Sequence, residues 1–368
     1  LFSANEIDRP HEALRNITIY HMDKQYEKQV HESVKIINLF NYDKSSLVYR
    51  LAHKLRPQIN TKAYWLAKLI KKIKPDIIHS MEMQQNAYLT YEAKKYIRGN
   101  FPTWIYSCWG SDIYYFQQFE NHRMHITEVL TNCDYLFTDC ERDSHLAVKY
   151  GFTGEFLGVF PGVGGFKIDE MRSVCQFVKP SERRIITIKG YAGWVYRPET
   201  IIKALELCDK ELKGFTIVMY LPGEKKFVDT AKEICEKIGV ELVIKQYSPH
   251  LEMIELFGSA RVSLAASISD GTPNSMLEAM VMGSFPIQSD TVSTAEWIND
   301  GVNGFLAQPE DYEGYARALK TALIDDNLVD SAANYNLDML KKKIDYDLVQ
   351  PKILRAYEHA FEHGKKNP

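Results

Sequence analysis

The sequence lacks the features that mark several special classes of protein. None of its apolar runs approaches the roughly 18 residues that a helix needs to span a bilayer. Neither sign of charge is in excess, because 45 Lys and Arg residues stand against 48 Asp and Glu residues, a formal net charge of −3. Such a balance gives no electrostatic argument for nucleic acid as a partner. The remaining composition is that of an ordinary globular protein, and 368 residues predict two domains rather than one.

Cysteine is scarce, and no two cysteines form a C-x-x-C pair. In a chain of this size, scattered cysteines predict reduced, mostly buried thiols in a cytoplasmic protein. The sequence also lacks an HExxH motif and paired Cys/His knuckles, so it predicts no metal site. Asp345 and Asp347 form a D-x-D pattern that binds metal in some enzymes. They lie in a late, charged, helix-like region, and we expect them on a solvated surface.

Short β-branched or aromatic runs alternate with longer helical patterns along the whole chain. In the first half, the predicted strands are 16–22, 76–81, 103–110 and 135–140. In the second half, they are 184–190, 215–221, 241–247, 262–267 and 285–290. Helices are predicted between them at 61–74, 84–98, 198–212, 225–238, 250–258 and 273–282. This alternation predicts an α/β protein with two doubly wound, Rossmann-like domains.

A Gly- and Pro-rich stretch, FLGVFPGVGGFKIDE at 156–170, separates the two series and has no helical periodicity. We therefore expect a first domain over 1–170 and a second over 171–345, with a terminal helix in 346–368 that packs back onto the first. The opening LFSANEIDRP has the pattern of a strand already under way. It predicts that a first βα unit of the domain precedes the given sequence.

The stretch SDGTPNSMLEAM, 269–280, joins the end of a small-residue strand to a helical pattern. Thr272 is predicted to be the N-cap and Pro273 the first helical residue. The backbone N–H groups of Asn274 and Ser275 then lack intrahelical partners and, with the positive end of the helix, favour an anion such as phosphate.

Two carboxylates flank this helix start. Glu278 shares the helical face of Asn274 and Ser275, where it is well placed to accept hydrogen bonds from ribose hydroxyls. Asp270 precedes the turn and is able to accept from another polyhydroxylated group. The structural alternative is an ordinary helix start, with Asp270 offsetting the helix dipole and Glu278 on a solvated face.

A second strand–turn–helix unit, IKGYAGWVYRPETIIKAL at 188–205, carries cations. Lys189 and Arg197 bracket a loop that contains Gly190 and Gly193. Two cations on a flexible turn suit a diphosphate, which takes both a point charge and forked donors. The alternative is a pair of surface cations beside a βα turn.

The strings SDGTPNSMLEAMVMGSFPIQSD and AEWINDGVNGFLAQPED resemble the donor-binding half of GT-B glycosyltransferases, specifically retaining glycosyltransferase family 4. The resemblance implies the GT-B fold, with two Rossmann-like domains facing a cleft. It also implies a nucleotide-sugar donor, expected to be a UDP-sugar, and a retaining transfer that requires no metal or other cofactor.

The resemblance also implies roles for individual residues. Glu278 would bind the ribose, and Asp270, where the family usually has Glu, would bind the hydroxyls of the transferred sugar in catalysis. The backbone from Gly271 through Thr272, Pro273 and Asn274 to Ser275 would hold the diphosphate and sugar.

The family pattern is altered at two further places. Around Gly190, the family usually has an Arg directly after the Gly and a Lys several residues later. This chain has Lys189 just before Gly190, Tyr191 where the Arg is expected, and Arg197 one place beyond the Lys position. In the first half, CWGSDIYYF at 108–116 resembles a segment of the catalytic cleft. There Asp112 matches, and Trp109 replaces a common His; both are candidate catalytic residues.

Several other features have two interpretations. The basic amphipathic segment 61–75 either contacts a membrane surface or packs on a sheet. His79 and Glu82 end a strand and either face a ligand or make structural hydrogen bonds, and the aromatics of 114–116 either stack on an acceptor sugar or pack in the core.

The leading functional hypothesis is a cytoplasmic transferase that moves a sugar to a glycan or lipid-linked acceptor in polysaccharide or glycoconjugate synthesis. If segment 61–75 binds the membrane, the protein is expected to be peripheral to it. A non-catalytic nucleotide-sugar-binding protein and a nucleotide-sugar epimerase on the same fold are the alternatives.

Overall fold

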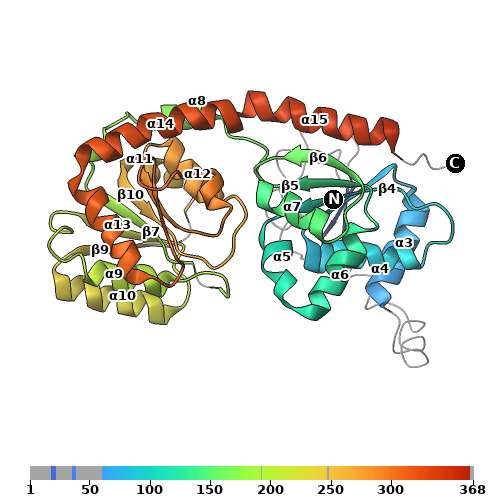
Figure 1. The fold of residues 1–368 in the computed structure, drawn as a ribbon, viewed down its shortest axis with the longest axis horizontal. Helices are drawn as coiled ribbons and strands as arrows, with labels where there is room; N and C mark the ends of the chain where they lie inside the picture. Colours follow the sequence, from blue (N-terminus) through green and yellow to red (C-terminus); the bar gives the residue numbers. More distant parts are fainter. Residues whose placement is uncertain (1–17, 22–34, 39–59, 192, 247, 365–368) are drawn as a thin grey trace. The chain divides into compact units, whose positions relative to one another are not determined.

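The computed structural model describes residues 18–21, 35–38, 60–191, 193–246 and 248–364 (Figure 1). The chain divides into two compact units, Leu1–Gly164 with Val349–Pro368, and Gly165–Leu348. The expectation about the opening residues LFSANEIDRP falls outside the described residues.

Unit 1 contains a four-stranded parallel sheet in the order β3-β4-β5-β6. These strands are β3 (Ile77–Met81), β4 (Thr103–Cys108), β5 (Tyr135–Thr138) and β6 (Glu155–Val159). All residues of β4 are buried, as expected for a central parallel strand covered on both faces. A separate parallel pair joins β1 (Thr18–His21) to β2 (Lys35–Asn38).

The helices of unit 1 follow its strands in the alternation that the sequence predicts. They are α3 (Thr61–Ile73), the π-helix η3 (Met83–Ala87), α4 (Tyr88–Lys95), α5 (Ser111–Tyr114), the 3-10 helix η4 (Phe116–Gln118), α6 (Glu120–Leu130) and α7 (Glu141–Lys149). The apolar face of α3 lies in the core, with Leu66, Leu69 and Ile70 buried. The structure therefore favours the packing interpretation of 61–75 and gives no support to a membrane contact through this apolar face.

The long helix α15 (Tyr346–His363) packs its C-terminal part on the sheet of unit 1. The hydroxyl of Tyr357 lies 2.8 Å from His79 Nδ1, and Ala360 is buried against Tyr135 and Phe137. The other ring nitrogen of His79 lies 2.6 Å from Ser107 Oγ. Burial lowers the pKa of His79 to about 3, so its ring is neutral and structural rather than part of a ligand site.

Unit 2 contains a six-stranded parallel sheet in the order β12-β11-β10-β7-β8-β9. The strands are β7 (Ile185–Lys189), β8 (Thr216–Tyr220), β9 (Glu241–Lys245), β10 (Ala260–Leu264), β11 (Phe285–Ser289) and β12 (Phe305–Ala307). The chain runs outward from β7 to β9, then returns to β10 beside β7 and continues to β12. The order therefore reverses between β7 and β10, which is the switch point where doubly wound sheets bind ligands.

Helices cover both faces of this sheet, and its core contains the buried residues of β7, β8, β10 and β11. The helices are α8 (Ile168–Ser173), α9 (Pro198–Glu206), α10 (Lys225–Ile238), α11 (His250–Ser259), α12 (Asn274–Val281), α13 (Tyr312–Ile324) and α14 (Asp326–Ile344), with short 3-10 turns η5 (Pro180–Glu182) and η6 (Thr294–Glu296). The two parallel sheets, each with intervening helices, confirm the predicted α/β class, and the sheet of unit 2 shows the reversal of strand order that marks a doubly wound sheet.

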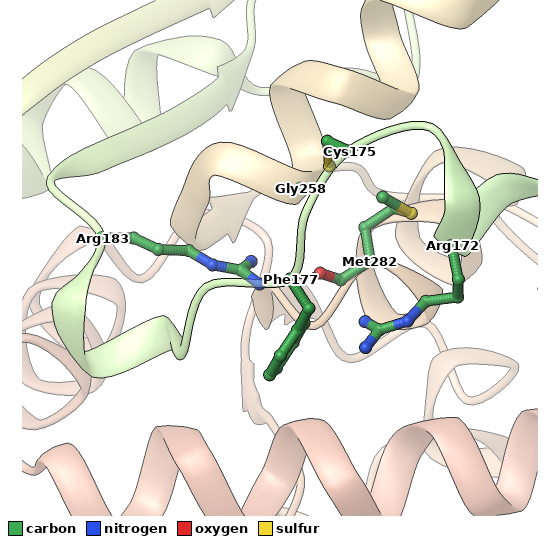
Figure 2. A pocket seen from close by; sticks show the side chains of 6 residues that line it. All are labelled: Arg172, Cys175, Phe177, Arg183, Gly258 and Met282. Carbon is green, nitrogen blue, oxygen red and sulfur yellow. Dashed lines mark hydrogen bonds between the residues drawn. The ribbon is translucent and has the colours of Figure 1, made fainter.

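A hollow near the amino ends of these strands is structural (Figure 2). Its principal group is the buried guanidinium of Arg183, which donates to the carbonyl oxygens of Ala260 (3.0 Å) and Met282 (3.1 Å), where α11 and α12 end. Phe177 lies between the side chains of Arg183 and Arg172. The hollow has no room for a water molecule. It therefore stabilises two helix ends and offers no ligand site.

Replacing this guanidinium should destabilise the fold. Arg183→Met keeps most of the apolar stem but leaves the helix-end carbonyls without their donor. We expect the free energy of unfolding to fall by about 2 kcal/mol or more. Burial lowers the pKa of Arg183 to about 10, so part of the loss is offset by removing a charge that is costly to bury. Urea denaturation measures the difference, and Arg184→Ala, at the exposed neighbouring position, is the control. Equal losses in the two variants would contradict the capping role.

Candidate active site

The loop after β7 and the segment after β10 are hydrogen-bonded to each other at the switch point of unit 2. Val195 O accepts from Ile268 N (2.8 Å), and Ala266 O accepts from Arg197 N (2.9 Å). Tyr196 and Ser267 form an isolated antiparallel bridge between these two hydrogen bonds. The predicted cationic turn and the predicted two-carboxylate stretch are thus joined at one edge of the sheet.

The helix start after β10 differs by one residue from the prediction. Pro273, with φ −71° and ψ 110°, is the N-cap of α12, and Asn274 is its first residue. Thr272 is not the cap, because its Oγ1 is buried and accepts from Trp297 Nε1 (3.2 Å). The carbonyl of Pro273 accepts the first intrahelical bond, from Leu277 N (3.2 Å).

The first backbone donors of α12 remain available. The N–H groups of Asn274 and Ser275 have no hydrogen-bond partner among the described residues. The side-chain Oδ1 of Asn274 is also buried without a partner within that part of the chain. Together with the helix dipole, the two backbone N–H donors make the start of α12 suited to an anion, as the sequence predicts, whereas Asn274 Oδ1 is an acceptor and would take an N–H or O–H donor.

Glu278 lies one turn into α12 and is largely enclosed, with 14% of its side chain exposed. Its Oε1 lies 2.7 Å from Nε2 of His250, the first residue of α11. Tyr220, at the end of β8, lies beside it and shares a hydrogen bond with the Ser275 side chain. Burial raises the pKa of Tyr220, the charge of Lys189 lowers it, and that of Glu278 raises it. No motif in the sequence selects His250, which begins a helix, or Tyr220, which ends a strand.

Lys189 ends β7 and makes no ion pair among the described residues. Its Nζ lies 4.9 Å from the centre of the Tyr196 ring. Burial raises the pKa of Tyr196, and the negative charge of Asp270 adds to that shift. The contacts around Tyr196 therefore bring Lys189 and Asp270 into one neighbourhood, which is the arrangement a charged ligand with hydroxyl groups requires.

Asp270 is positioned by its own turn. Its Oδ1 accepts from Gly271 N (3.0 Å), and the carbonyls of Asp270 and Gly271 accept from Ser293 Oγ at 3.1 and 2.8 Å. Val292, beside Ser293, has a positive φ of 68°, which a β-branched residue rarely adopts. Such strain is found where the surrounding structure fixes a functional loop.

Arg197 is placed differently from Lys189. Its Nη1 donates to the carbonyls of Trp194 (3.0 Å) and Tyr196 (2.9 Å), and its Nε pairs with Glu310 (3.1 Å). Arg197 therefore stabilises the loop, and its charge is already paired with that of Glu310. Its role in binding a diphosphate stays a prediction. Gly190 is required by packing, because a Cβ there would lie 2.6 Å from Met219 Cγ.

The candidate residues of unit 1 also follow strand ends. Asp112, in α5, is buried, and its Oδ2 accepts from Met83 N and from the Tyr106 hydroxyl, each at 3.1 Å. Glu82, directly after β3, accepts from three backbone N–H groups of η3 and has a positive φ of 75°. Burial and the charge of Glu82 raise the pKa of Asp112 to about 7. Trp109 is 37% exposed at the end of β4, with no acid or base function of its own.

Other candidates in unit 1 are structural. Tyr114 lies under the guanidinium of Arg142, 3.9 Å from its ring centre, and Phe116 packs on His122. Arg142 also pairs with the buried Asp143 at 2.9 Å. Asp143 forms a compact group with Asp139 and Cys140, the one set of described side chains close enough to hold a metal ion. Arg142 already places a positive charge beside that group, so we assign it no metal. In unit 2, Asp345 accepts from Asp347 N (3.1 Å) at the start of α15, a capping contact.

The raised pKa of Asp112 predicts a pH-dependent stability. Between its unfolded value of about 4 and its folded value of about 7, the folded state holds a proton that the unfolded state has lost. The contribution of Asp112 to stability therefore falls as pH rises through this range. Asp112→Asn cannot ionise, so its stability relative to the parent should be on the order of 2 kcal/mol higher at pH 8 than at pH 5.

Urea denaturation at both pH values measures this difference. Asp76→Asn, at an exposed position of the same unit, is the control. Its free energy of unfolding should differ from that of the parent by the same amount at both pH values. A pH-independent difference for Asp112→Asn would contradict the raised pKa.

Comparison with known proteins shows the fold and the family of the chain that carries this site. The family model described as "Glycosyl transferases group 1" matches residues 172–339, and the one described as "Glycosyl transferase 4-like" matches 15–139. EpsD of Bacillus subtilis (strain 168), which carries the name of a glycosyltransferase, is 30% identical over 120 residues. That match spans 33% of this chain and 31% of EpsD.

Solved structures match nearly the whole chain at low identity. HepE of Anabaena, in complex with UDP and glucose, gives a TM-score of 0.69 at 13% identity, covering 93% of this chain and 91% of HepE. Sucrose-phosphate synthase of Thermosynechococcus elongatus gives 0.71 at 12% identity, covering 94% and 89%. In the part of the chain that the structure describes, no helix is long and apolar enough to cross a membrane.

The two family models cover the two Rossmann-like units in turn, and the solved structures share their fold. The chain thus belongs to the group 1 glycosyltransferases and has the GT-B fold.

Proposed function

We propose that this chain is a retaining glycosyltransferase of family 4 that transfers a sugar from a UDP-sugar to a glycan or lipid-linked acceptor in polysaccharide or glycoconjugate synthesis. The observation that carries the proposal is the group of side chains and backbone donors at the switch point of unit 2. Free N–H groups begin α12, Lys189 supplies a cation, and Asp270 and Glu278 supply acceptors for hydroxyls. Family membership and the UDP and glucose bound to HepE support this donor class.

Each part of the donor has a group suited to it. The diphosphate accepts from Asn274 N and Ser275 N beside Lys189. The ribose hydroxyls donate to Glu278, and the hydroxyls of the transferred sugar donate to Asp270 and the backbone near Gly271.

Departure of the nucleoside diphosphate leaves negative charge on its oxygens. Lys189 and the positive end of α12 stabilise that charge as it develops in the transition state, so the proposed mechanism requires no metal. Retention follows from a front-face route, in which the leaving phosphate helps to deprotonate the acceptor hydroxyl. Asp112 and Trp109 of unit 1 are proposed for the acceptor side, where the raised pKa of Asp112 suits proton exchange near neutral pH.

A thermal-shift screen with nucleoside diphosphates and their sugars tests the donor assignment. UDP and one or more UDP-sugars should raise the melting temperature, because a ligand at 100 times its Kd adds about 2.7 kcal/mol. The hit with the largest shift then serves in a transfer assay against glycan and lipid-linked acceptors.

Glu278→Gln tests the site directly. The variant loses the charge that accepts from ribose, so we expect the Kd for UDP to rise at least about tenfold and turnover to fall strongly. Glu255→Gln, at an exposed position in the same unit, is the matched control. Unchanged binding and turnover in Glu278→Gln would overturn the proposed site.

The second candidate function is a non-catalytic nucleotide-sugar-binding protein. It is favoured by Trp109, which brings an indole without acid–base capacity to the position where the family commonly has His. Donor binding without transfer to any acceptor would support it. Conversion of the donor with no acceptor present would instead indicate a nucleotide-sugar epimerase.

A further inference from the structure

The enclosed carboxylate of Glu278 has a partner that the donor assignment does not require. His250 Nε2 lies 2.7 Å from Glu278 Oε1, and no other described residue forms an ion pair with this carboxylate. The distance is that of a strong hydrogen bond, and Nε2 must carry the proton because a carboxylate accepts only. The His250 ring therefore fixes one oxygen of Glu278 and leaves the second without a partner among the side chains that the structure describes.

The two partners lie on different elements of unit 2. His250 opens α11 directly after the β9 turn, with Pro249 as N-cap, while Glu278 lies one turn into α12. The two helices pack against each other and end at the same Arg183 guanidinium. Arg183 holds the C-terminal ends of α11 and α12, so the positions of these helices do not depend on the contact between His250 and Glu278 near their N-terminal ends. That contact therefore constrains the side-chain rotamer of Glu278.

The exposure of the pair is unequal. His250 has 56% of its side chain exposed, against 14% for Glu278. The Tyr220 hydroxyl shares its hydrogen bond with Ser275 rather than with Glu278. The imidazole thus supplies the enclosed carboxylate with a donor from the solvent side, while a ligand approaches beside Ser275.

We propose that His250 is a positioning residue of the donor site: it holds Glu278 in the rotamer that presents Oε2 to the ribose hydroxyls of a nucleoside diphosphate. This inference rests on the proposed function, since it takes Glu278 as the ribose ligand. A side chain already fixed before binding loses less rotamer freedom when the ligand binds, so the pair increases affinity without touching the ligand.

The experiment compares two probes, UDP and its 2′,3′-dideoxyribose analogue, by titration calorimetry. The analogue lacks the hydroxyls that Glu278 would accept from, so the ratio of its Kd to that of UDP isolates the ribose contact. In the parent we expect UDP to bind at least about tenfold more tightly than the analogue. His250→Ala should weaken UDP about fivefold and leave the analogue unchanged, and His250→Gln, which keeps an N–H donor, should restore part of the loss.

The double variant His250→Ala/Glu278→Gln separates positioning from a direct contact. If His250 acts through Glu278, the double variant binds UDP no more weakly than Glu278→Gln alone. In the transfer assay, His250→Ala should raise the donor KM by the same factor as the Kd and leave kcat within about twofold. His125→Ala, which breaks an exposed His–Glu pair of unit 1, is the control and should change neither constant.

Several results would overturn the inference. Equal weakening of both probes by His250→Ala would assign a general structural role, and tighter UDP binding would mean that His250 competes with ribose. Additive losses in the double variant would mean a contact independent of Glu278. If Glu278→Gln weakens UDP while His250→Ala does not, this inference fails and the proposed function stands. If the parent does not discriminate the two probes, the ribose assignment of Glu278 fails and this inference fails with it.

Discussion

The candidate donor site depends on the parallel pairing of β7 with β10. These strands are separated in sequence by β8, β9 and three helices, yet Thr187, Ile188 and their neighbours pair directly with Ser263 and Leu264. Parallel strands end at the same edge of a sheet, so the turn after β7 and the turn after β10 must emerge together. Beyond the strands, the two turns meet again in the antiparallel bridge of Tyr196 with Ser267, beside the hydrogen bond from Ile268 N to Val195 O. This register places Lys189, at the end of β7, at the same edge of the sheet as the Asp270 turn and the start of α12.

The charges at this edge are arranged for a ligand rather than for mutual neutralisation. Lys189 has no carboxylate partner among the described residues, whereas Arg197 at the far end of the same loop is already paired with Glu310. The unpaired N–H groups of Asn274 and Ser275 add positive potential from the helix dipole. A compact region with an unpaired cation and free N–H donors favours an anion, while the flanking acids require hydroxyl donors. A phosphorylated sugar satisfies both conditions at once.

The sequence predicted the elements well and the local roles less well. Both parallel sheets follow from the alternation of apolar runs and helical patterns, because that periodicity reports burial directly. The N-cap was misplaced by one residue, since Thr272 bonds to Trp297, which is distant in sequence. His250 and Tyr220 were not predicted for the same reason: each reaches Glu278 or Ser275 through tertiary packing, which no local pattern encodes. Conversely, Arg197 looked like a ligand cation because its partner Glu310 lies far along the chain.

The amino ends and the carboxyl ends of the unit 2 strands differ in whether the backbone hydrogen-bonding groups of the neighbouring helix ends have partners. At the amino ends, where α11 and α12 finish, the Arg183 guanidinium satisfies the last carbonyls and the space is filled. At the carboxyl ends, the N–H groups of Asn274 and Ser275 have no partner within the described part of the chain, and Leu221 after β8 and Val292 after β11 have a strained backbone with positive φ. Unit 1 repeats the pattern with Glu82 after β3. Strained backbone and unsatisfied donors both reduce stability, by about 1–3 kcal/mol for each strained residue. A ligand that binds these donors recovers part of that free energy, so the edge that stabilises the fold least is also the edge best prepared for binding.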